Sequence, residues 1–187
     1  MKQSDILGIL LNEENTKRLD ELGKIHKYTK HYLLLAEELS EDGVAFLQPM
    51  KEHRDAYDHL VRVLSLHMRV TDLPDDFDYN YYVGDNLKKS YGHEYRAFFD
   101  TADWLTFICR KSIRETLSFA TKRKMYISKY SEKDFEETRK FINNVPFDIA
   151  KYREKKDISN VALLEEVEEY KVTLDKLIEI YKKIQAI

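Results

Sequence analysis

The chain has 187 residues, and its 43% hydrophobic and 12% aromatic content argues against disorder and suffices for the core of one folded domain over residues 1–187. Five glycines and three prolines are few turn-forming residues for a protein built from strands and turns. The 35% of charged residues suit helices whose outer faces are exposed to solvent. We therefore expect an all-α fold, and a net charge of −3 is not that of proteins that hold nucleic acid by its backbone.

The first part of the chain contains two predicted helices. A short apolar segment at residues 6–11 precedes a long helix over residues 13–39, which has apolar residues at helical spacing and is expected to end before Gly43. The second helix is expected to begin near Pro49, because proline is tolerated in a first helical turn, and to extend to about Val70.

The middle of the chain predicts two more helical segments. A polar and aromatic loop over residues 73–82 leads into a third helix over residues 86–121. Ser131, with Asp134 three positions later, resembles a capping box and predicts the start of a fourth helix. Pro146 interrupts that helix, so we expect it to be kinked or split in two.

The last segment has the most regular pattern in the chain, a heptad seam with spacings of 4, 3, 4, 3, 4 and 3. Its residues are Leu163, Val167, Tyr170, Leu174, Leu177, Tyr181 and Ile184. Such a seam packs at a shallow angle against a neighbouring helix, either within a bundle or across a subunit boundary. Further apolar residues widen the stripe, which favours the core of an up-and-down bundle of about five helices. The same face could instead build a homodimer.

The number of cysteines and the hydropathy of the sequence indicate where in the cell the protein is expected to function. Cys109 is the single cysteine and cannot form an internal disulfide. There is no leader-like segment and no apolar run of about 20 residues, so we expect a cytoplasmic protein that does not span a membrane. Because the sequence has no Gly-rich phosphate loop and no Cys/His metal spacing, we expect no cofactor.

The best candidates for catalysis are Arg54 and His59 in the second predicted helix, with Asp55 directly after the arginine. Arginine offers a cationic fork for phosphate oxygens and histidine can move a proton near neutral pH, a combination that suits cleavage of a phosphodiester. Arg54 and His59 lie about 140° apart on an ideal helix, so either two copies of the chain or a distorted first turn must bring them together. Asp55 has the spacing to orient His59, and Arg62 can balance Asp58 or contact phosphate.

The residues from Arg54 to His59 match a pattern of arginine, polar residue, three variable residues and histidine. This pattern resembles that of the HEPN-domain ribonucleases, helical bundles of prokaryotic toxin and antiphage defence systems, over these six residues. The resemblance implies a metal-independent endoribonuclease in which two protomers form a composite site. It also implies that the RNA 2′-hydroxyl attacks the adjacent phosphate while His59 transfers protons, Arg54 stabilises the phosphorane and Asp55 holds the pair in place.

The third predicted helix has a set of polar residues whose composition is similar to that of the polar residues around Arg54 on the second predicted helix. The two sets are His93, Glu94, Arg96, Asp100 and Asp103 on the third helix and Glu52, His53, Arg54, Asp55, Asp58 and His59 on the second. If they face each other, they form either a site with perturbed pKa values or a structural ion network. Neither Glu52 nor Glu94 is followed by histidine three positions later, as in di-iron bundles, so we expect no metal.

Partners are predicted from charge and from the motif. Between Arg110 and Lys129 seven residues are basic and Glu115 alone is acidic, which indicates either a patch for RNA or a solvated helix end. The expected partners are therefore RNA and a second copy of the chain. The alternative is a non-catalytic accessory or scaffold protein that binds a protein partner through the C-terminal helix.

Overall fold

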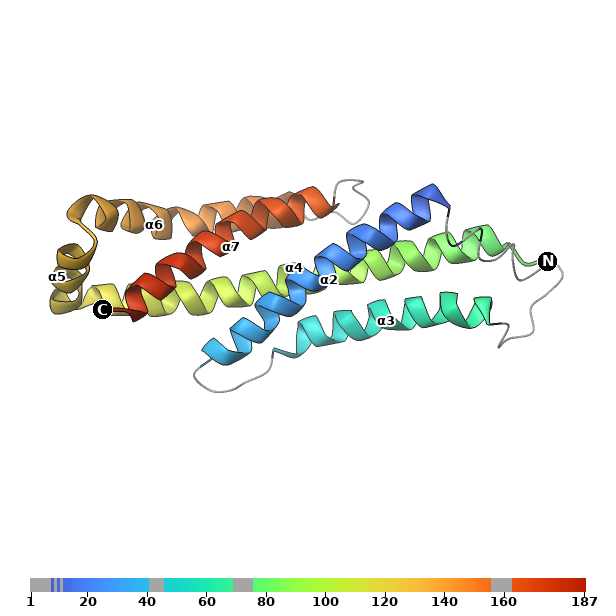
Figure 1. The fold of residues 1–187 in the computed structure, drawn as a ribbon, viewed down its shortest axis with the longest axis horizontal. Helices are drawn as coiled ribbons and strands as arrows, with labels where there is room; N and C mark the ends of the chain where they lie inside the picture. The colour runs from blue at the N-terminus through green and yellow to red at the C-terminus, as the bar shows by residue number, and fades with distance from the viewer. Residues whose placement is uncertain (1–7, 9, 11, 41–45, 69–75, 156–162) are drawn as a thin grey trace. The chain divides into compact units, whose positions relative to one another are not determined.

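The computed structural model describes residues 8, 10, 12–40, 46–68, 76–155 and 163–187. Over these residues the protein is a helical bundle with six helices and no strand, which confirms the all-α fold (Figure 1). The helices are α2 (Glu13–Leu39), α3 (Leu47–His67), α4 (Tyr79–Ser118), α5 (Ala120–Lys129), α6 (Glu132–Lys155) and α7 (Leu163–Gln185). Most of the expected apolar start at 6–11, the stop at Gly43 and residues 73–75 of the predicted loop lie outside the described residues.

The chain divides into two compact units. Unit 1 comprises Met1–His31 and Ala45–Asp100, and unit 2 comprises Tyr32–Val44 and Thr101–Ile187. Helix α3 belongs to unit 1, helices α5 to α7 belong to unit 2, and α2 and α4 each contribute to both. The single domain over residues 1–187 stays a prediction, because two continuous helices run through both units.

Unit 1 is built on an antiparallel pair, in which α3 lies alongside the first half of α4 (Figure 1). Its helices bury a cluster formed by Val63 and Leu66 of α3 with Val83 and Leu87 of α4. The Ser90 hydroxyl of α4 also donates a hydrogen bond of 2.9 Å to the carbonyl of Ala56. This pairing sets the register in which polar side chains of the two helices meet.

Helix α4 begins seven residues before the predicted start, at Tyr79 instead of residue 86. The reason is an N-terminal cap, since Asp78 Oδ1 accepts a hydrogen bond of 2.9 Å from the backbone N–H of Tyr81. The rings of Phe77 and Tyr82, on either side of this cap, lie 5.2 Å apart and form a hydrophobic staple. Residues 79–82 of the predicted aromatic loop are therefore the first turn of the helix.

Unit 2 contains a helix that the sequence analysis missed. Helix α4 ends at Ser118, and Phe119 adopts an extended conformation with φ −77° and ψ 124° before α5 begins. The prediction of one helix to residue 121 was therefore wrong at its end. Within unit 2, α5 packs on α6 and α6 packs on α7.

Helix α6 confirms the predicted cap and, of the two outcomes expected at Pro146, excludes a split. The Ser131 hydroxyl accepts a hydrogen bond of 3.1 Å from the backbone N–H of Asp134, and Ser131 itself has a positive φ of 137°. Pro146 does not split the helix, which continues to Lys155. A proline cannot bond to the carbonyl four residues earlier, and here that carbonyl, of Ile142, accepts a 3.5 Å hydrogen bond from Arg114.

Helix α7 buries its heptad seam, which confirms that the seam belongs to a bundle core. All seam residues are buried except Tyr181, which is half-buried. The Tyr170 hydroxyl donates a hydrogen bond of 2.8 Å to Asp103. Cys109 is buried in the same unit, and burial raises the pKa of its thiol to about 12, so it remains protonated.

Candidate functional site

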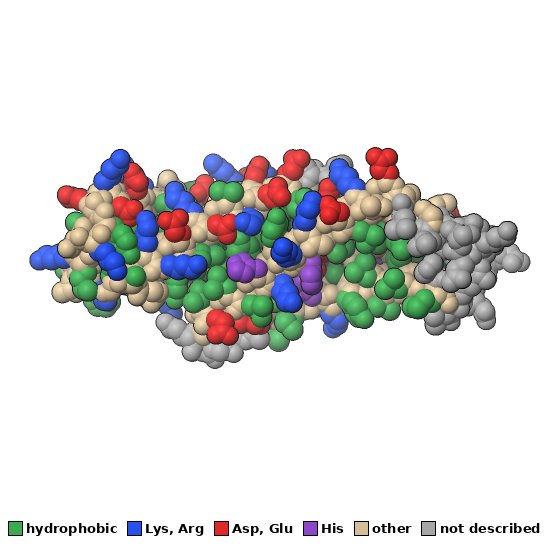
Figure 2. Space-filling view, viewed as in Figure 1, with side chains coloured by type: hydrophobic (Ala, Val, Ile, Leu, Met, Phe, Trp, Pro, Cys, Tyr) green, Lys and Arg blue, Asp and Glu red, His purple; other side chains and the backbone are tan. Residues whose placement is uncertain are grey.

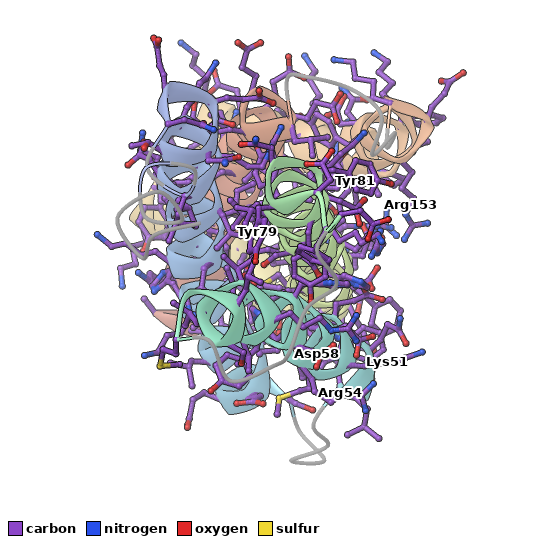
Figure 3. All side chains as sticks on the ribbon, turned by 90° about the vertical axis from the view of Figure 1, so that its right-hand side faces the viewer. Lys51, Arg54, Asp58, Tyr79, Tyr81 and Arg153 are labelled. Carbon is purple, nitrogen blue, oxygen red and sulfur yellow. The ribbon has the colours of Figure 1, made fainter. Side chains whose placement is uncertain are left out.

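Arg54 and Asp55 form an ion pair on the solvent side of α3. The Nε and Nη2 atoms of Arg54 donate hydrogen bonds of 3.0 and 2.8 Å to Asp55 Oδ1, and these bonds lower the pKa of Asp55. The Arg54 side chain is 71% exposed, and Figure 3 shows it pointing away from α4, with Lys51 and Asp58 nearby on the same helix. Asp55 thus binds Arg54 and leaves its guanidinium open to solvent, whereas the resemblance implied that Asp55 holds both Arg54 and His59.

His59 points towards α4 and is held by a residue that the sequence analysis did not single out. Its Nδ1 atom lies 2.8 Å from Oδ1 of Asn86. The amide nitrogen of Asn86 donates a hydrogen bond of 2.8 Å to the Tyr82 carbonyl, so the amide oxygen faces the imidazole and accepts from Nδ1–H. The structure therefore orients His59 through Asn86, and not through Asp55, and among the described residues Nε2 has no hydrogen-bond partner.

Beside His59 lies a triad of Glu52, His93 and Arg96. The His59 and His93 rings stack with their centroids 5.5 Å apart. Arg96 Nε donates a hydrogen bond of 2.8 Å to Glu52 Oε2, and His93 Nδ1 lies 2.8 Å from the same oxygen. Burial alone raises the pKa of Glu52, but the hydrogen bonds from Arg96 and His93 outweigh it and hold the pKa below its ordinary value. Glu52 thus holds the Arg96 guanidinium and contacts the His93 imidazole through the same oxygen.

A second histidine–carboxylate group joins α2, α3 and α4. The buried Glu94 carboxylate lies 2.9 Å from His53 Nδ1 and 3.3 Å from His26 Nδ1. The contacts between α3 and α4 are therefore reciprocal. His53 of α3 contacts Glu94 of α4, and the neighbouring Glu52 of α3 contacts His93 of α4. Histidine side chains reach the surface between α2 and α3 in Figure 2. The prediction that the two polar sets face each other is confirmed for these residues.

The other predicted site residues are Asp58, Arg62, Asp100 and Asp103. Asp58 pairs with Arg62 at 2.6 Å on the exposed side of α3. Asp100 is half-buried on α4, one turn beyond Arg96. Asp103 belongs to unit 2, where it pairs with Arg153 at 2.8 Å.

The basic segment of the sequence contributes to a cavity in unit 2. The cavity has a volume of about 200 Å³ and combines an apolar wall with three arginines. The arginines are Arg114, Arg123 and Arg139. Arg139 pairs with Glu136 at 2.8 Å, whereas the guanidinium of Arg123 has no hydrogen bond or ion pair with any described residue. The cavity can therefore accept an anion at Arg123.

No protein family, no curated protein and no solved structure matches the chain significantly. None of the helices in the described residues combines the length and the apolar character that crossing a membrane requires.

Proposed function

We propose that the protein is a metal-independent endoribonuclease of the HEPN type, with His59 as the proton-transfer group and Arg54 as the phosphate-binding group. The observation that carries the proposal is the hydrogen bond from His59 to Asn86, which fixes Nδ1 as the protonated nitrogen and leaves Nε2 free. Such an imidazole can take a proton from a reacting hydroxyl group. The neighbouring Arg54 guanidinium is exposed and already aligned by Asp55.

In the proposed reaction the RNA 2′-hydroxyl attacks the adjacent phosphorus. His59 Nε2 accepts the 2′-hydroxyl proton as the new O–P bond forms, and Arg54 binds the non-bridging oxygens of the crowded phosphorane. The bond from phosphorus to the 5′-oxygen then breaks, and that oxygen takes a proton from a protonated imidazole. The products are a 2′,3′-cyclic phosphate and a 5′-hydroxyl, so no metal, oxidant or water is consumed in this step.

Arg54 and His59 leave α3 on different sides, so the proposal includes a second copy of the chain. The exposed side of α3 supports this, because it carries an unburied heptad seam with spacings of 3, 4, 3, 4, 3 and 4. The seam consists of Leu47, Met50, Arg54, Tyr57, Val61, Leu64 and Met68, all exposed except the half-buried Val61. Hydrophobic side chains are visible over α3 in Figure 2. A long apolar seam on a helix favours pairing with another helix.

The charges on the exposed side of α3 favour a second copy of the chain as the partner that covers the seam. Arg54 and Asp58 have opposite charges and lie four residues apart on the exposed side of α3. If two α3 helices pair antiparallel around a twofold axis near Ala56, each Arg54 lies opposite Asp58 of the other copy. Such a pair places Arg54 of each protomer at the interface between the two copies, while His59 of each protomer stays on the side of α3 that faces α4.

The test is cleavage of fluorescent single-stranded RNA in EDTA by the wild type and by variants whose folding is confirmed by circular dichroism. We expect His59→Ala to lower the rate by about 10²–10⁴-fold, because a general base is lost. Arg54→Ala should lower it by about 10²–10³-fold through lost charge stabilisation. Asn86→Ala should lower the rate and alter its pH profile, since the imidazole can then exchange tautomers.

Two matched controls are available. His31→Ala removes another exposed histidine, and Arg153→Ala removes another exposed arginine that is paired with an aspartate. Both should cleave RNA at the wild-type rate. A requirement for added metal, or full activity of folded His59→Ala, would contradict the proposal.

A non-catalytic accessory protein is the second candidate, and the exposed seam of α3 favours it as well. In that case the seam binds a different protein, and the histidine cluster ties the helices of unit 1 together. The absence of cleavage by the wild type across varied RNAs, with α3 still required for association with a partner, would favour this candidate.

A further inference from the structure

Glu94 is a buried carboxylate with no permanent cation beside it. It is 2% exposed, and among the described residues its partners are His26 and His53. Its Oε1 atom is buried and makes no hydrogen bond, although His26 Nδ1 lies 3.3 Å away. A buried carboxylate is costly unless a positive charge or hydrogen-bond donors compensate it.

The neighbouring carboxylate shows what Glu94 lacks. Glu52 faces a histidine in the same way, but it also accepts a hydrogen bond of 2.8 Å from Arg96. Glu94 faces two histidines and neither lysine nor arginine among the described residues. When both imidazoles are neutral, the Glu94 charge has no counter-ion, and the nitrogen lone pairs are available as ligands.

The donor atoms of this group suit one metal ion. One nitrogen from each of His26 and His53 and one oxygen of Glu94 lie within 4.8 Å of one another. The two imidazole rings are 5.2 Å apart and meet edge to face, so both can direct a nitrogen to a common point. Ligand atoms around a tetrahedral zinc ion are about 3.3 Å apart. The carboxylate of Glu94 is close to this distance from both histidines, with Oε1 3.3 Å from His26 Nδ1 and Oε2 2.9 Å from His53 Nδ1.

We propose that His26, His53 and Glu94 bind a divalent transition-metal ion of the zinc type. Two imidazoles and one carboxylate are a common ligand set for such ions. The group can be reached from solvent, because the His26 side chain is 54% exposed. The ion supplies the charge that Glu94 lacks and links α2, α3 and α4, one ligand from each helix. This proposal does not depend on RNA cleavage, in which the ion takes no part.

The test is direct zinc binding by the full chain after treatment with a chelator. Isothermal titration should give one Zn²⁺ per chain, and Co²⁺ in the same site should give the visible absorption of a tetrahedral complex. Glu94→Gln should weaken binding by about 100-fold or more, because it removes a ligand and the only negative charge of the set. Zinc should raise the melting temperature of the wild type but not of Glu94→Gln.

Two further variants distinguish the loss of a zinc ligand from a folding defect. His26→Ala changes a largely exposed side chain and should fold normally, yet lose zinc affinity to a similar extent. His31→Ala removes an exposed histidine of the same helix that is outside the group and should bind zinc like the wild type. Equal zinc affinity of the wild type and folded His26→Ala, or no saturable binding, overturns the proposal. Because RNA is absent from these measurements, they are independent of the ribonuclease test.

Discussion

Glu52 connects the stability of unit 1 to pH through its contacts with Arg96 and His93. Its pKa is lowered from 4.5, because the hydrogen bonds and charges of these partners outweigh burial. At a pH between the lowered pKa and 4.5, the unfolded chain binds a proton that the folded chain does not. The stabilisation is therefore complete above 4.5 and is lost as the pH falls through the lower pKa of the folded state.

We predict that Glu52→Gln destabilises the protein by about 2 kcal/mol at neutral pH, because Arg96 loses a charged hydrogen-bond acceptor. The difference in the free energy of unfolding between wild type and variant should shrink as the pH falls from about 7 to about 3. Urea unfolding followed by circular dichroism at several pH values measures this difference. Comparison with the variant removes the effects of Asp55 and Asp134, whose pKa values are also lowered. A difference that is constant over this range would contradict the assigned role of Glu52.

At the scale of the helix, α3 has two apolar sides with different environments. Its inward side is buried through Ala56, Val63 and Leu66. On its outward side Tyr57 is 67% exposed and Leu64 is 49% exposed. A single helix that is apolar on both sides is expected where the bundle covers one side and another molecule covers the other.

We predict that Tyr57→Glu and Leu64→Glu each convert the proposed dimer into a monomer, because they place a charge in the apolar seam. They should also lower RNA cleavage without unfolding the chain, since both side chains are outside the core. Size-exclusion chromatography with light scattering measures the oligomeric state. Val172→Glu is the control, because Val172 is 70% exposed but lies on α7. A wild-type monomer at micromolar concentration, or a dimer that survives both changes, would contradict pairing through α3.

The elements that the sequence predicted well are those with a long, regular pattern or a local cap. The apolar spacing of α2 and the heptads of α7 recur over several turns, and Ser131 needs only its near neighbours to cap α6. The start of α4 was missed because an aromatic run preceded by aspartate reads as a loop until the ring contacts of Phe77 are known. Helix α5 was missed because ten residues offer too little periodicity, and Tyr126 alone is buried.

The candidate site could be predicted only in part for a related reason. The mirrored order of glutamate and histidine on two helices was visible in the sequence and indicated that they pair. The parts played by Asn86 and His26 depend on helix register, which a single helical pattern does not contain. Likewise, the spacing of Asp55 and His59 permits a contact on the helix, but the adjacent Arg54 takes the carboxylate.

Over the whole molecule, the two units have different polar chemistry. Unit 1 contains the histidine and carboxylate cluster, whereas unit 2 contains the cavity lined by Arg114, Arg123 and Arg139. Although the net charge of the chain is −3, positive charge is concentrated locally at the cavity of unit 2. A protein that acts on RNA needs such a cationic surface to hold the phosphate backbone, whatever its overall charge.

We predict that the cavity of unit 2 binds a phosphate of the RNA through Arg123, whose guanidinium has no other partner among the described residues. Arg123→Gln should weaken binding of single-stranded RNA and reduce the slope of log affinity against log salt concentration by about 0.7, the loss of one phosphate contact. Fluorescence anisotropy over a series of salt concentrations measures both quantities. The control is Lys182→Gln, which removes an exposed cation of the same unit that does not line the cavity. Equal slopes for the wild type and Arg123→Gln would assign RNA binding to other cations. An equal reduction of the slope in Arg123→Gln and Lys182→Gln would indicate an effect of total charge, because only a specific phosphate contact makes the two substitutions differ.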